Sequence, residues 1–233
     1  RSAATAKLTA HAMDCPSLDL ELALHQQGYR FVAGLDEAGR GAWAGPVVAA
    51  AVILPLDRCD LGRVLCGVRD SKQLTPAARS ALYDVIMDVA VAVGTGVSAP
   101  RVIDRDGIVP ATRRAMMRAL ARLSVSPDVL VLDHVHLPGV TLPQLSTPKA
   151  DAHHLCVAAA SIIAKVTRDR LMVLLDSRFP GYGFAAHKGY GTARHRAQLT
   201  QMGPACIHRH SFAPLRDNEL SRNVKGLFAS PET

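Results

Sequence analysis

The stretch that decides the fold is Leu35-Asp36-Glu37-Ala38-Gly39-Arg40-Gly41, in which two adjacent carboxylates end an apolar run and glycines follow. The run before the acids, residues 31–35, predicts a buried strand that leaves the core where the charges begin. A second apolar run over residues 47–54, bounded by prolines, predicts the next strand. The two carboxylates are therefore expected near a turn between two strands.

The glycines after the acids do not form a dinucleotide-binding loop. Such a loop is followed by a helix, whereas an apolar strand follows here, and the spacing of Gly39, Gly41 and Gly45 differs from that motif. Their density instead favours a close approach of the backbone to another group. Because neighbouring residues of a regular strand point to opposite faces, Asp36 and Glu37 are expected to share one metal ion only if the backbone leaves the pleat.

Composition favours one main domain that binds a polyanion. The chain has 233 residues, of which 48% are hydrophobic, and a formal net charge of +7. We expect a flexible segment at 1–16, a catalytic domain at 17–216 whose C-terminal helical part covers about 176–216, and a polar tail at 217–233.

The compartment and the assembly state are inferred from absences in the sequence. The five cysteines form no C-x-x-C pair and accompany no signal peptide, which predicts a cytoplasmic location. No apolar stretch reaches the ~20 residues of a membrane-spanning helix, so no membrane role is expected. A monomer is the default expectation.

Capping residues and apolar periodicity predict the helices and the remaining strands. Helices are expected after Ser17, from Thr75 and Pro76, after Pro110, from about Ala152 to Leu175, and from Thr192 to Gly203. Strands are expected at 90–97 and 129–133, and connecting loops at 57–74, 135–148 and 181–192. Four arginines of the helix after Pro110 allow two interpretations, a solvated helix face or a track for phosphates; these are Arg113, Arg114, Arg118 and Arg122.

Acidic residues at three separate places are expected to meet. The apolar residues 129–132 predict a buried parallel strand that ends at Asp133, so two predicted strands each end in an acid. Asp151 precedes the longest predicted helix, where it could cap the helix, bind a metal ion, or do both.

A cluster of four carboxylates would be costly without cations to balance it. Mg²⁺ or Mn²⁺ prefers carboxylate oxygens, and two such ions could hold the attacking and leaving oxygens of a phosphodiester in line. Zinc is a weaker alternative because the available side chains match no zinc motif. These side chains are His134, His136, His153, His154, Cys206, His208 and His210.

Tyr190 lies between two glycines, downstream of His187 and Lys188. A buried aromatic residue usually has apolar neighbours in register, which Tyr190 lacks. We therefore consider its ring a stacking platform for a sugar or base.

Six segments occur in one order between Phe31 and Pro214: DEAGRG at 36–41 followed by GP at 45–46, DSK at 70–72, Asp133, the stretch 149–169, HKGYGT at 187–192 and HSFAP at 210–214. Together they resemble ribonuclease HII, the type 2 ribonuclease H family. The resemblance implies a ribonuclease H-like α/β fold, with a mixed sheet flanked by helices and a smaller C-terminal helical region.

The resemblance also implies an activity and a set of site residues. The activity is endonucleolytic cleavage of the RNA strand of RNA–DNA hybrids, and of the 5′ side of ribonucleotides embedded in duplex DNA, leaving 3′-hydroxyl and 5′-phosphate ends. This chemistry would serve ribonucleotide removal and RNA primer processing. The implied catalytic and metal-binding acids are Asp36, Glu37, Asp133 and Asp151. Gly39, Arg40 and Gly41 would read the 2′-hydroxyl, and Tyr190 would stack on the next sugar.

Three cations near these segments, Lys72, Lys165 and Arg168, are interpreted either as phosphate contacts or as surface and helix-end charges. The chain departs from the family pattern at His134, at Ala150 and in the loop 135–148, which concerns loop geometry. Two alternatives remain open: another two-metal nuclease or phosphatase of the same broad fold, and a hybrid-binding protein without activity.

Overall fold

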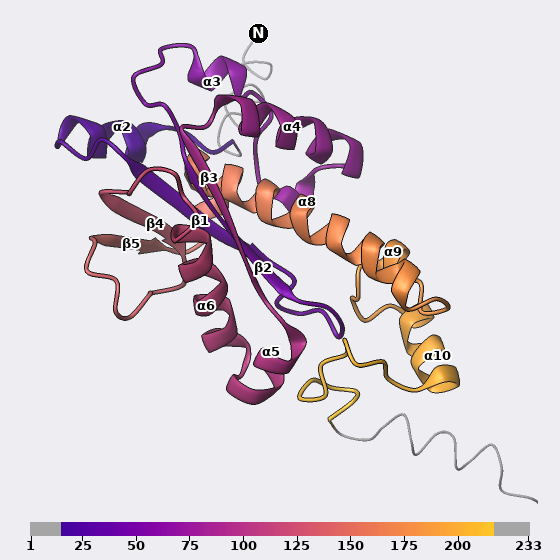
Figure 1. Cartoon of the computed structure of the whole chain (residues 1–233). Coiled ribbons are helices and arrows are strands. Elements are labelled where there is room, and N and C mark those ends of the chain that lie inside the picture. The colour runs from indigo at the N-terminus through magenta and orange to yellow at the C-terminus, as the bar shows by residue number, and fades with distance from the viewer. Residues whose placement is uncertain (1–14, 217–233) are drawn as a thin grey trace, which may run out of the picture.

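A five-stranded mixed sheet organises the computed structural model, which describes residues 15–216 (Figure 1). The strands are β1 Val32–Ala38, β2 Val47–Ile53, β3 Ala92–Ser98, β4 Val129–Asp133 and β5 Gln144–Thr147, in the spatial order β3-β2-β1-β4-β5. β1, β2 and β3 are antiparallel, whereas β4 runs parallel to β1 and β5 runs parallel to β4. The expected mixed sheet is confirmed.

Helices cover both faces of this sheet. The helices of residues 15–216 are α2 Asp19–Gln26, α3 Leu61–Val64, α4 Pro76–Val89, α5 Pro100–Asp106, α6 Ile108–Leu120, α7 Ala150–His153, α8 Leu155–Arg178, α9 Phe184–His187 and α10 Ala193–Met202, with a 3-10 turn η1 at Ser71–Gln73. α8 lies across one face with α4 beside it, and α6 covers the other face (Figure 1). Alternate residues of β1 and β2 thus enter two separate apolar cores.

The packing of α8 on β1 depends on Gly34. A Cβ atom at this position would lie 2.3 Å from the carbonyl carbon of Cys156 and 2.5 Å from the nitrogen of Val157. The small residues 158–161 of α8 are all buried. The close contact fixes α8 against the strand that carries Asp36.

A third apolar cluster lies beyond the end of the sheet, in the C-terminal part of the chain. Tyr182 and Phe184 are buried there and stack with their ring centroids 5.2 Å apart. The expected loop at 181–192 also contains the short helix α9. As predicted, Thr192 caps the following helix, its hydroxyl accepting from the amide of His195 at 3.1 Å.

The structure corrects several other element predictions. The expected loop at 57–74 contains α3 and η1, and the expected linker at 135–148 contains strand β5. The helix expected after Pro110 begins at Ile108 and is preceded by α5.

Two other helix predictions are confirmed. The helix that follows Ser17 is present, with Leu18 as its N-cap residue. The helix from Thr75 is confirmed, and the Thr75 hydroxyl accepts from the amide of Ala78.

The long helix expected from Ala152 to Leu175 is divided at His154, which has an extended backbone. The interruption is held by a segment distant in sequence. The amide of Ser17 donates to the carbonyl of His153, and the amide of Leu155 donates to the carbonyl of Ser17, both at 3.0 Å. Neither local propensity nor periodicity contains this tertiary contact, so one helix was the wrong prediction.

The four arginines in and after α6 lie on a solvated face, the first of the two expected interpretations, because Arg114, Arg118 and Arg122 are exposed and Arg113 is half-buried. Arg118 and Arg122 donate to the carbonyls of Val97 and Thr95 on the edge strand β3, and Arg113 donates to the carbonyl of His136. Arg114 pairs with Asp106 at 3.3 Å. Two of the four arginines thus occupy carbonyl groups at an edge where another strand could otherwise add.

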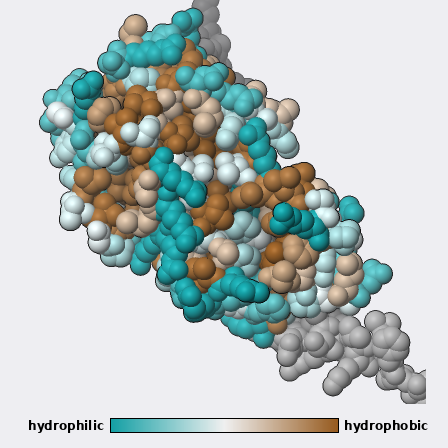
Figure 2. Space-filling model, in the orientation of Figure 1, coloured by the Kyte–Doolittle hydropathy of each residue, from teal (hydrophilic) through white to brown (hydrophobic). Residues whose placement is uncertain are grey.

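The surface in the orientation of Figure 1 is a mosaic, with a hydrophilic band between hydrophobic areas (Figure 2). Among residues 15–216, no helix is long and apolar enough to cross a membrane. The five cysteines are free. Residues 1–14 of the expected flexible segment 1–16, and all of the expected tail 217–233, lie outside the described residues.

Candidate active site

Two of the predicted acidic positions meet because β1 and β4 are parallel neighbours. Their pairing ends at Leu35 and Leu132, so Asp36 and Asp133 follow the last paired residues at the same end of the sheet. In parallel strands the carboxyl ends share one edge, which is where α/β proteins place their ligands. The structure therefore brings these two acids to one place, as the sequence predicts.

Asp36 and Glu37 lie in a regular part of β1. Both pair with β2 in continuous register, Asp36 with Ala50 and Glu37 with Ala49, so the backbone does not leave the pleat. Asp36 shares its face with Ala38 and Ala50, which pack under α8, and Glu37 points to the other face. The backbone therefore does not depart from the strand pleat, the condition under which the two carboxylates could share one metal ion. They lie near the end of the strand on opposite faces.

Asp151 comes to this edge on the short helix α7. It lies in the first turn and is 7% exposed, while the N-cap residue is Lys149 in a left-handed conformation. Asp151 is therefore not the N-cap residue, although its carboxylate lies in the first turn and accepts a hydrogen bond from the amide of Ala152. The amide of Ala150 donates to a carboxylate oxygen of Asp133 at 3.3 Å, which ties the start of α7 to the end of β4.

Lys72 connects the acids electrostatically. Its Nζ atom lies 4.0 Å from a carboxylate oxygen of Asp151 and 4.0 Å from one of Asp70. Desolvation alone would lower the pKa of Lys72, but the charges of Asp70, Asp151, Asp36 and Asp133 together raise it. The same ammonium group acts on Glu37. Lys72 is thus within electrostatic range of all four predicted acids, although its side chain is 81% exposed.

The carboxylates carry more negative charge than their surroundings compensate. Burial, and then the charge of Glu37, raises the pKa of Asp36 well above its usual value. Burial raises the pKa of Glu37 despite the nearby Arg40, and burial followed by the charge of Asp70 raises the pKa of Asp151. Oε2 of Glu37 is buried and makes no hydrogen bond within residues 15–216. This donor set fits a hard divalent cation that brings its own water ligands.

The acids do not form a closed cage. Within the described part of the chain, no three Asp, Glu, His or Cys side chains are gathered closely enough to enclose an ion. The candidate zinc ligands at positions 134, 136, 153, 154, 206, 208 and 210 are therefore not assembled. A magnesium-like ion can tolerate an open set because it keeps water or substrate oxygens as ligands.

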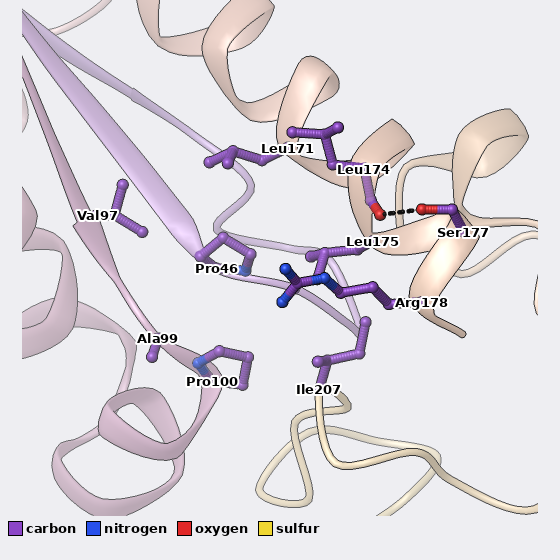
Figure 3. Close-up of a pocket in the computed structure, with 11 residues that line it drawn as sticks. Pro46, Val97, Ala99, Pro100, Leu171, Leu174, Leu175, Ser177, Arg178 and Ile207 are labelled. Atoms are coloured by element: carbon purple, nitrogen blue, oxygen red, sulfur yellow. Dashed lines mark hydrogen bonds between the residues drawn. The ribbon is translucent and has the colours of Figure 1, made fainter.

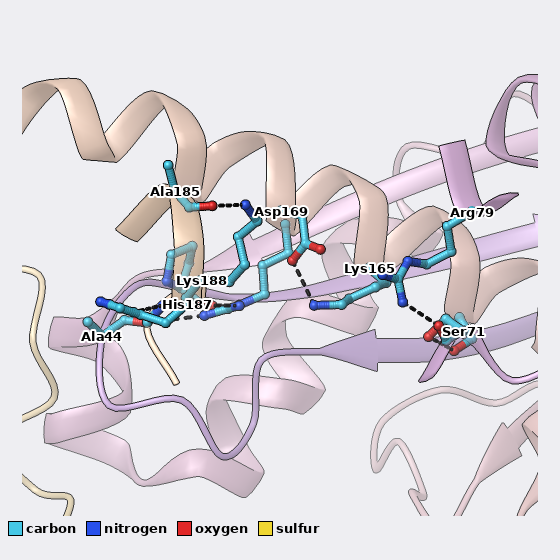
Figure 4. A network of polar contacts seen from close by, with 12 residues as sticks. Ala44, Ser71, Arg79, Lys165, Asp169, Ala185, His187 and Lys188 are labelled. Carbon is cyan, nitrogen blue, oxygen red and sulfur yellow. Dashed lines mark hydrogen bonds and ion pairs between the residues drawn. The ribbon is translucent and has the colours of Figure 1, made fainter. Parts of the chain in front are cut away.

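A serine pair that sequence reasoning missed orients Asp36. The hydroxyl of Ser161 on α8 donates to the Asp36 carboxylate, and the hydroxyls of Ser161 and Ser71 lie 2.9 Å apart. Because Ser161 donates to Asp36, Ser71 must donate to Ser161. Arg79 donates in turn to the carbonyl of Ser71 (Figure 4). The signal in the sequence was a serine within an alanine-rich buried helix.

The segment Gly39-Arg40-Gly41 follows directly from β1. Gly39 has φ +94°, and a Cβ atom there would lie 1.9 Å from Nε of Arg168. Arg40 is exposed and pairs with Glu37 at 3.1 Å, whereas a Cβ at Gly41 would meet no atom within 4 Å. The segment is therefore tightly packed at its first glycine and open at its second.

Two buried arginines hold this segment from inside. Arg168 donates to the carbonyls of Pro46, Ala44 and Lys188, at 2.9, 3.1 and 3.0 Å. Arg209 donates to the carbonyls of Arg40 and Gly45, at distances from 2.8 to 3.0 Å. Both interpretations of Arg168, phosphate contact and surface charge, are wrong, because it is fully buried. Sequence reasoning missed Arg209, although it adjoins the HSFAP segment.

Tyr190 is half-buried beside two cations. Nζ of Lys165 and Cζ of Arg168 lie 5.3 and 5.1 Å from its ring centroid. Lys165 also pairs with Asp169 at 2.8 Å, a contact visible in Figure 4. The neighbouring carbonyl of Gly189 accepts from the amides of Trp43 and Ala44, at 2.8 and 3.2 Å. Backbone hydrogen bonds therefore join the segment that carries Tyr190 to the segment after Gly41.

A groove of about 680 Å³ lies apart from the acids, between the end of β3, the C-terminal half of α8 and Ile207 (Figure 3). Its lining is mostly apolar, and none of the predicted site residues contributes to it. The acids therefore do not belong to this groove.

The family model described as Ribonuclease HII matches residues 33–215. The chain belongs to the ribonuclease HII family. It is a ribonuclease H, a hydrolase that acts on RNA–DNA substrates.

Individual relatives agree with this membership. Ribonuclease HII from Chloroflexus aurantiacus is 52% identical over 206 residues, which cover 88% of this chain and 97% of that protein. The enzyme from Roseiflexus castenholzii is 54% identical over 202 residues, covering 87% and 90%. The crystal structure of ribonuclease H2 from Pyrococcus horikoshii superposes with a TM-score of 0.70 at 28% identity, covering 84% of this chain and 99% of that one. The ribonuclease H-like fold expected from the sequence is thereby confirmed.

Proposed function

We propose that this ribonuclease cleaves the RNA strand of RNA–DNA hybrids and the 5′ side of ribonucleotides embedded in duplex DNA. The products carry 3′-hydroxyl and 5′-phosphate ends, and the activity serves ribonucleotide removal and RNA primer processing. The observation that carries the proposal is that Asp36 and Asp133 follow the last paired residues of neighbouring parallel strands, with Lys72 within electrostatic range of all four predicted acids.

Asp36, Glu37, Asp133 and Asp151 would hold Mg²⁺ or Mn²⁺, two ions when substrate is bound. The ions would supply an activated water and stabilisation of charge on the phosphodiester oxygens. The raised pKa values of Asp36, Glu37 and Asp151 support this role, because cations would relieve the burial and repulsion that raise them. Ser161, supported by Ser71, fixes the direction of the Asp36 carboxylate.

Recognition of the ribonucleotide is assigned to Gly39, Arg40 and Gly41. The 2′-hydroxyl distinguishes RNA from DNA and can both donate and accept a hydrogen bond. The open space at Gly41 supports a close approach of the sugar to the backbone. Arg168 and Arg209 occupy the inward carbonyls of this loop and so fix its shape. Tyr190 stacks on the following sugar, and the exposed Lys72 contacts a phosphate.

The test is cleavage of a labelled DNA duplex with one ribonucleotide, beside an all-DNA duplex and a long hybrid, with and without Mg²⁺ or Mn²⁺. We expect a metal-dependent cut on the 5′ side of the ribonucleotide and an intact all-DNA duplex. Asp36→Asn should abolish cleavage and leave duplex binding largely unchanged. Equal cutting of both duplexes would indicate a general nuclease, and unchanged turnover of Asp36→Asn would refute the site.

A further inference from the structure

Three buried histidines form a cluster in the C-terminal part of the molecule, apart from the acidic edge. They are His187 of α9, His195 of α10 and His208, which are 8%, 0% and 1% exposed. The rings of His187 and His195 stack at 4.2 Å, and the Nε2 atoms of His195 and His208 lie 3.1 Å apart. The proposed cleavage chemistry uses none of them.

The hydrogen-bond partners define the proton positions on His195 and His208. Nδ1 of His195 lies 3.0 Å from the carbonyl of Tyr190, which can only accept, so this nitrogen carries the proton. Nε2 of a neutral His195 must then accept, and Nε2 of His208 donates to it. Nδ1 of His208 consequently accepts from the amide of Ala205 at 2.9 Å.

The opposite arrangement is excluded by its own contacts. The Ala205 carbonyl lies 3.1 Å from Nδ1 of His208 and could accept a proton from it. That tautomer of His208 would direct a lone pair at the lone pair of His195, unless His195 also switched. A switched His195 would direct a lone pair at the carbonyl of Tyr190. Only the first assignment satisfies all of these nitrogens.

His187 has an equally complete set of partners. Its Nδ1 accepts from the amide of Gly189 at 3.1 Å, so its Nε2 carries the proton that is donated to the carbonyl of Tyr182 at 2.7 Å. Burial, the largest cause in each case, lowers the pKa of His195 and of His208 to about 4. The two rings that meet at Nε2 are therefore neutral at neutral pH.

These contacts converge on the segment that carries Tyr190. His187 holds the amide of Gly189, and His195 holds the carbonyl of Tyr190. On its other side, Gly189 has φ +80° and packs so closely that a Cβ would lie 2.4 Å from the carbonyl oxygen of Ala44. The backbone around Tyr190 is thus fixed between the histidines and the loop that follows Gly41.

We propose that His187, His195 and His208 form a positioning relay that sets the spacing between the Tyr190 ring and the Gly39–Gly41 segment. The inference rests on the proposed stacking role of Tyr190. A duplex with one ribonucleotide offers a single productive register, whereas a long hybrid offers many. The relay therefore supports cleavage at isolated ribonucleotides more than cleavage of long hybrids.

The test compares two substitutions of His195. Leucine has a similar volume and no polar atoms, whereas the amide nitrogen of asparagine can replace Nδ1 and donate to the Tyr190 carbonyl. We expect His195→Leu to lower kcat/KM on the single-ribonucleotide duplex by roughly 10- to 100-fold, with a smaller loss on the long hybrid. His195→Asn should recover most of this loss. The exposed His136, substituted as His136→Asn, is the matched control and should behave as wild type.

A double-mutant cycle separates the relay from the role of Tyr190. If the relay acts through Tyr190, His195→Leu will have little further effect in a Tyr190→Ala background. No loss from Tyr190→Ala alone would refute the proposed role of Tyr190 itself. Additive losses, equal losses on both substrates, or an asparagine variant as poor as the leucine variant would each overturn the relay.

A spectroscopic measurement on the unmodified protein keeps the test decisive even if His195→Leu does not fold. Two-dimensional ¹⁵N–¹H spectra of the imidazole rings at pH 7 should show His195 protonated at Nδ1, and His187 and His208 protonated at Nε2. Any other tautomer, or a protonated imidazolium in this set, would overturn the relay.

Discussion

Replacing Gly34 with alanine should push α8 away from β1. The added Cβ would lie 2.3 to 2.5 Å from backbone atoms of Cys156 and Val157, whereas ordinary contacts begin at 3.4 Å. The backbones must therefore separate by about 1 Å, a gap that forfeits roughly a quarter to a half of the local dispersion energy. Overpacking in cores costs about 1–3 kcal/mol and more where the obstacle cannot rotate away, so we expect a loss of about 3–4 kcal/mol.

The loss is measurable as the free energy of unfolding in urea, followed by circular dichroism and by the fluorescence of Trp43, the single tryptophan of the chain. For a domain of this size it corresponds to a fall in Tm of roughly 10 °C. Cleavage should fall as well, because α8 carries the Ser161 hydroxyl that orients Asp36.

Gly62→Ala is the matched control. Gly62 lies in α3, and a Cβ there would meet no atom within 4 Å, so alanine should leave stability unchanged or raise it by about 0.5–1 kcal/mol. If the two variants unfold within about 0.5 kcal/mol of each other, the reasoning from the contact of α8 with β1 is refuted.

Four further predictions follow from contacts described above. Because burial lowers the pKa of His195 and His208 from 6.5 to about 4, the unfolded chain binds more protons between these values, so their contribution to stability is complete above pH 6.5 and is lost toward pH 4. The raised pKa values of the acids oppose this trend, so the pH dependence of urea unfolding is compared between wild type and His195→Asn. Between pH 6.5 and 5, the variant should lose about 1–2 kcal/mol less stability than wild type, and an equal pH dependence of the two proteins would contradict the lowered pKa values of these histidines. In Arg168→Lys, the lysine cannot donate to all three carbonyls at once, so calorimetry should show a loss of about 2–4 kcal/mol in the free energy of unfolding together with impaired cleavage. Wild-type stability of this variant would show that the three hydrogen bonds of the guanidinium are not needed. Thr75→Ala removes a helix cap distant from the acids and should cost about 1 kcal/mol in urea unfolding without changing kcat, so an altered kcat would be unexpected. Lys72→Met removes a cation that competes with metal ions, so titration calorimetry without substrate should show Mn²⁺ binding roughly 3- to 10-fold tighter, while unchanged or weaker affinity would contradict that competition.

Patterns within single segments predicted much of the fold. The apolar run that ends in Asp133 predicted β4 at its observed bounds, and the Thr75-Pro76 pair predicted the start of α4. The run before Asp36 predicted β1 but not its last three residues, which continue through both acids to Ala38 because they pair with β2. Strand β5 could not be predicted in this way, because its four residues Gln144–Thr147 lie between prolines and are held by pairing with β4. Its strand conformation therefore depends on the hydrogen bonds with β4 and not on its own amino-acid composition.

The candidate site was predictable only where function leaves local patterns. Acids at strand ends and a tyrosine between glycines are visible in the sequence, and the structure places Asp36 and Asp133 side by side. The arginines behind the loop are different. Arginine is usually a surface residue, so the sequence does not indicate that Arg168 and Arg209 are buried. Only the tertiary fold shows that backbone carbonyls accept hydrogen bonds from each guanidinium. The division of the long helix at His154 likewise depends on Ser17.

The contact between Arg209 and the loop after β1 has a consequence for the order in which the enzyme is completed. The guanidinium donates to the carbonyls of Arg40 and Gly45, so these hydrogen bonds of the loop depend on a residue that is synthesised long after the loop residues themselves. Contacts of such long sequence separation carry a large loop-closure cost and form late in folding. In a nascent chain that ends before Arg209, the carbonyls of Arg40 and Gly45 lack this guanidinium, so the loop that is proposed to select a ribonucleotide is completed only after Arg209 has been synthesised.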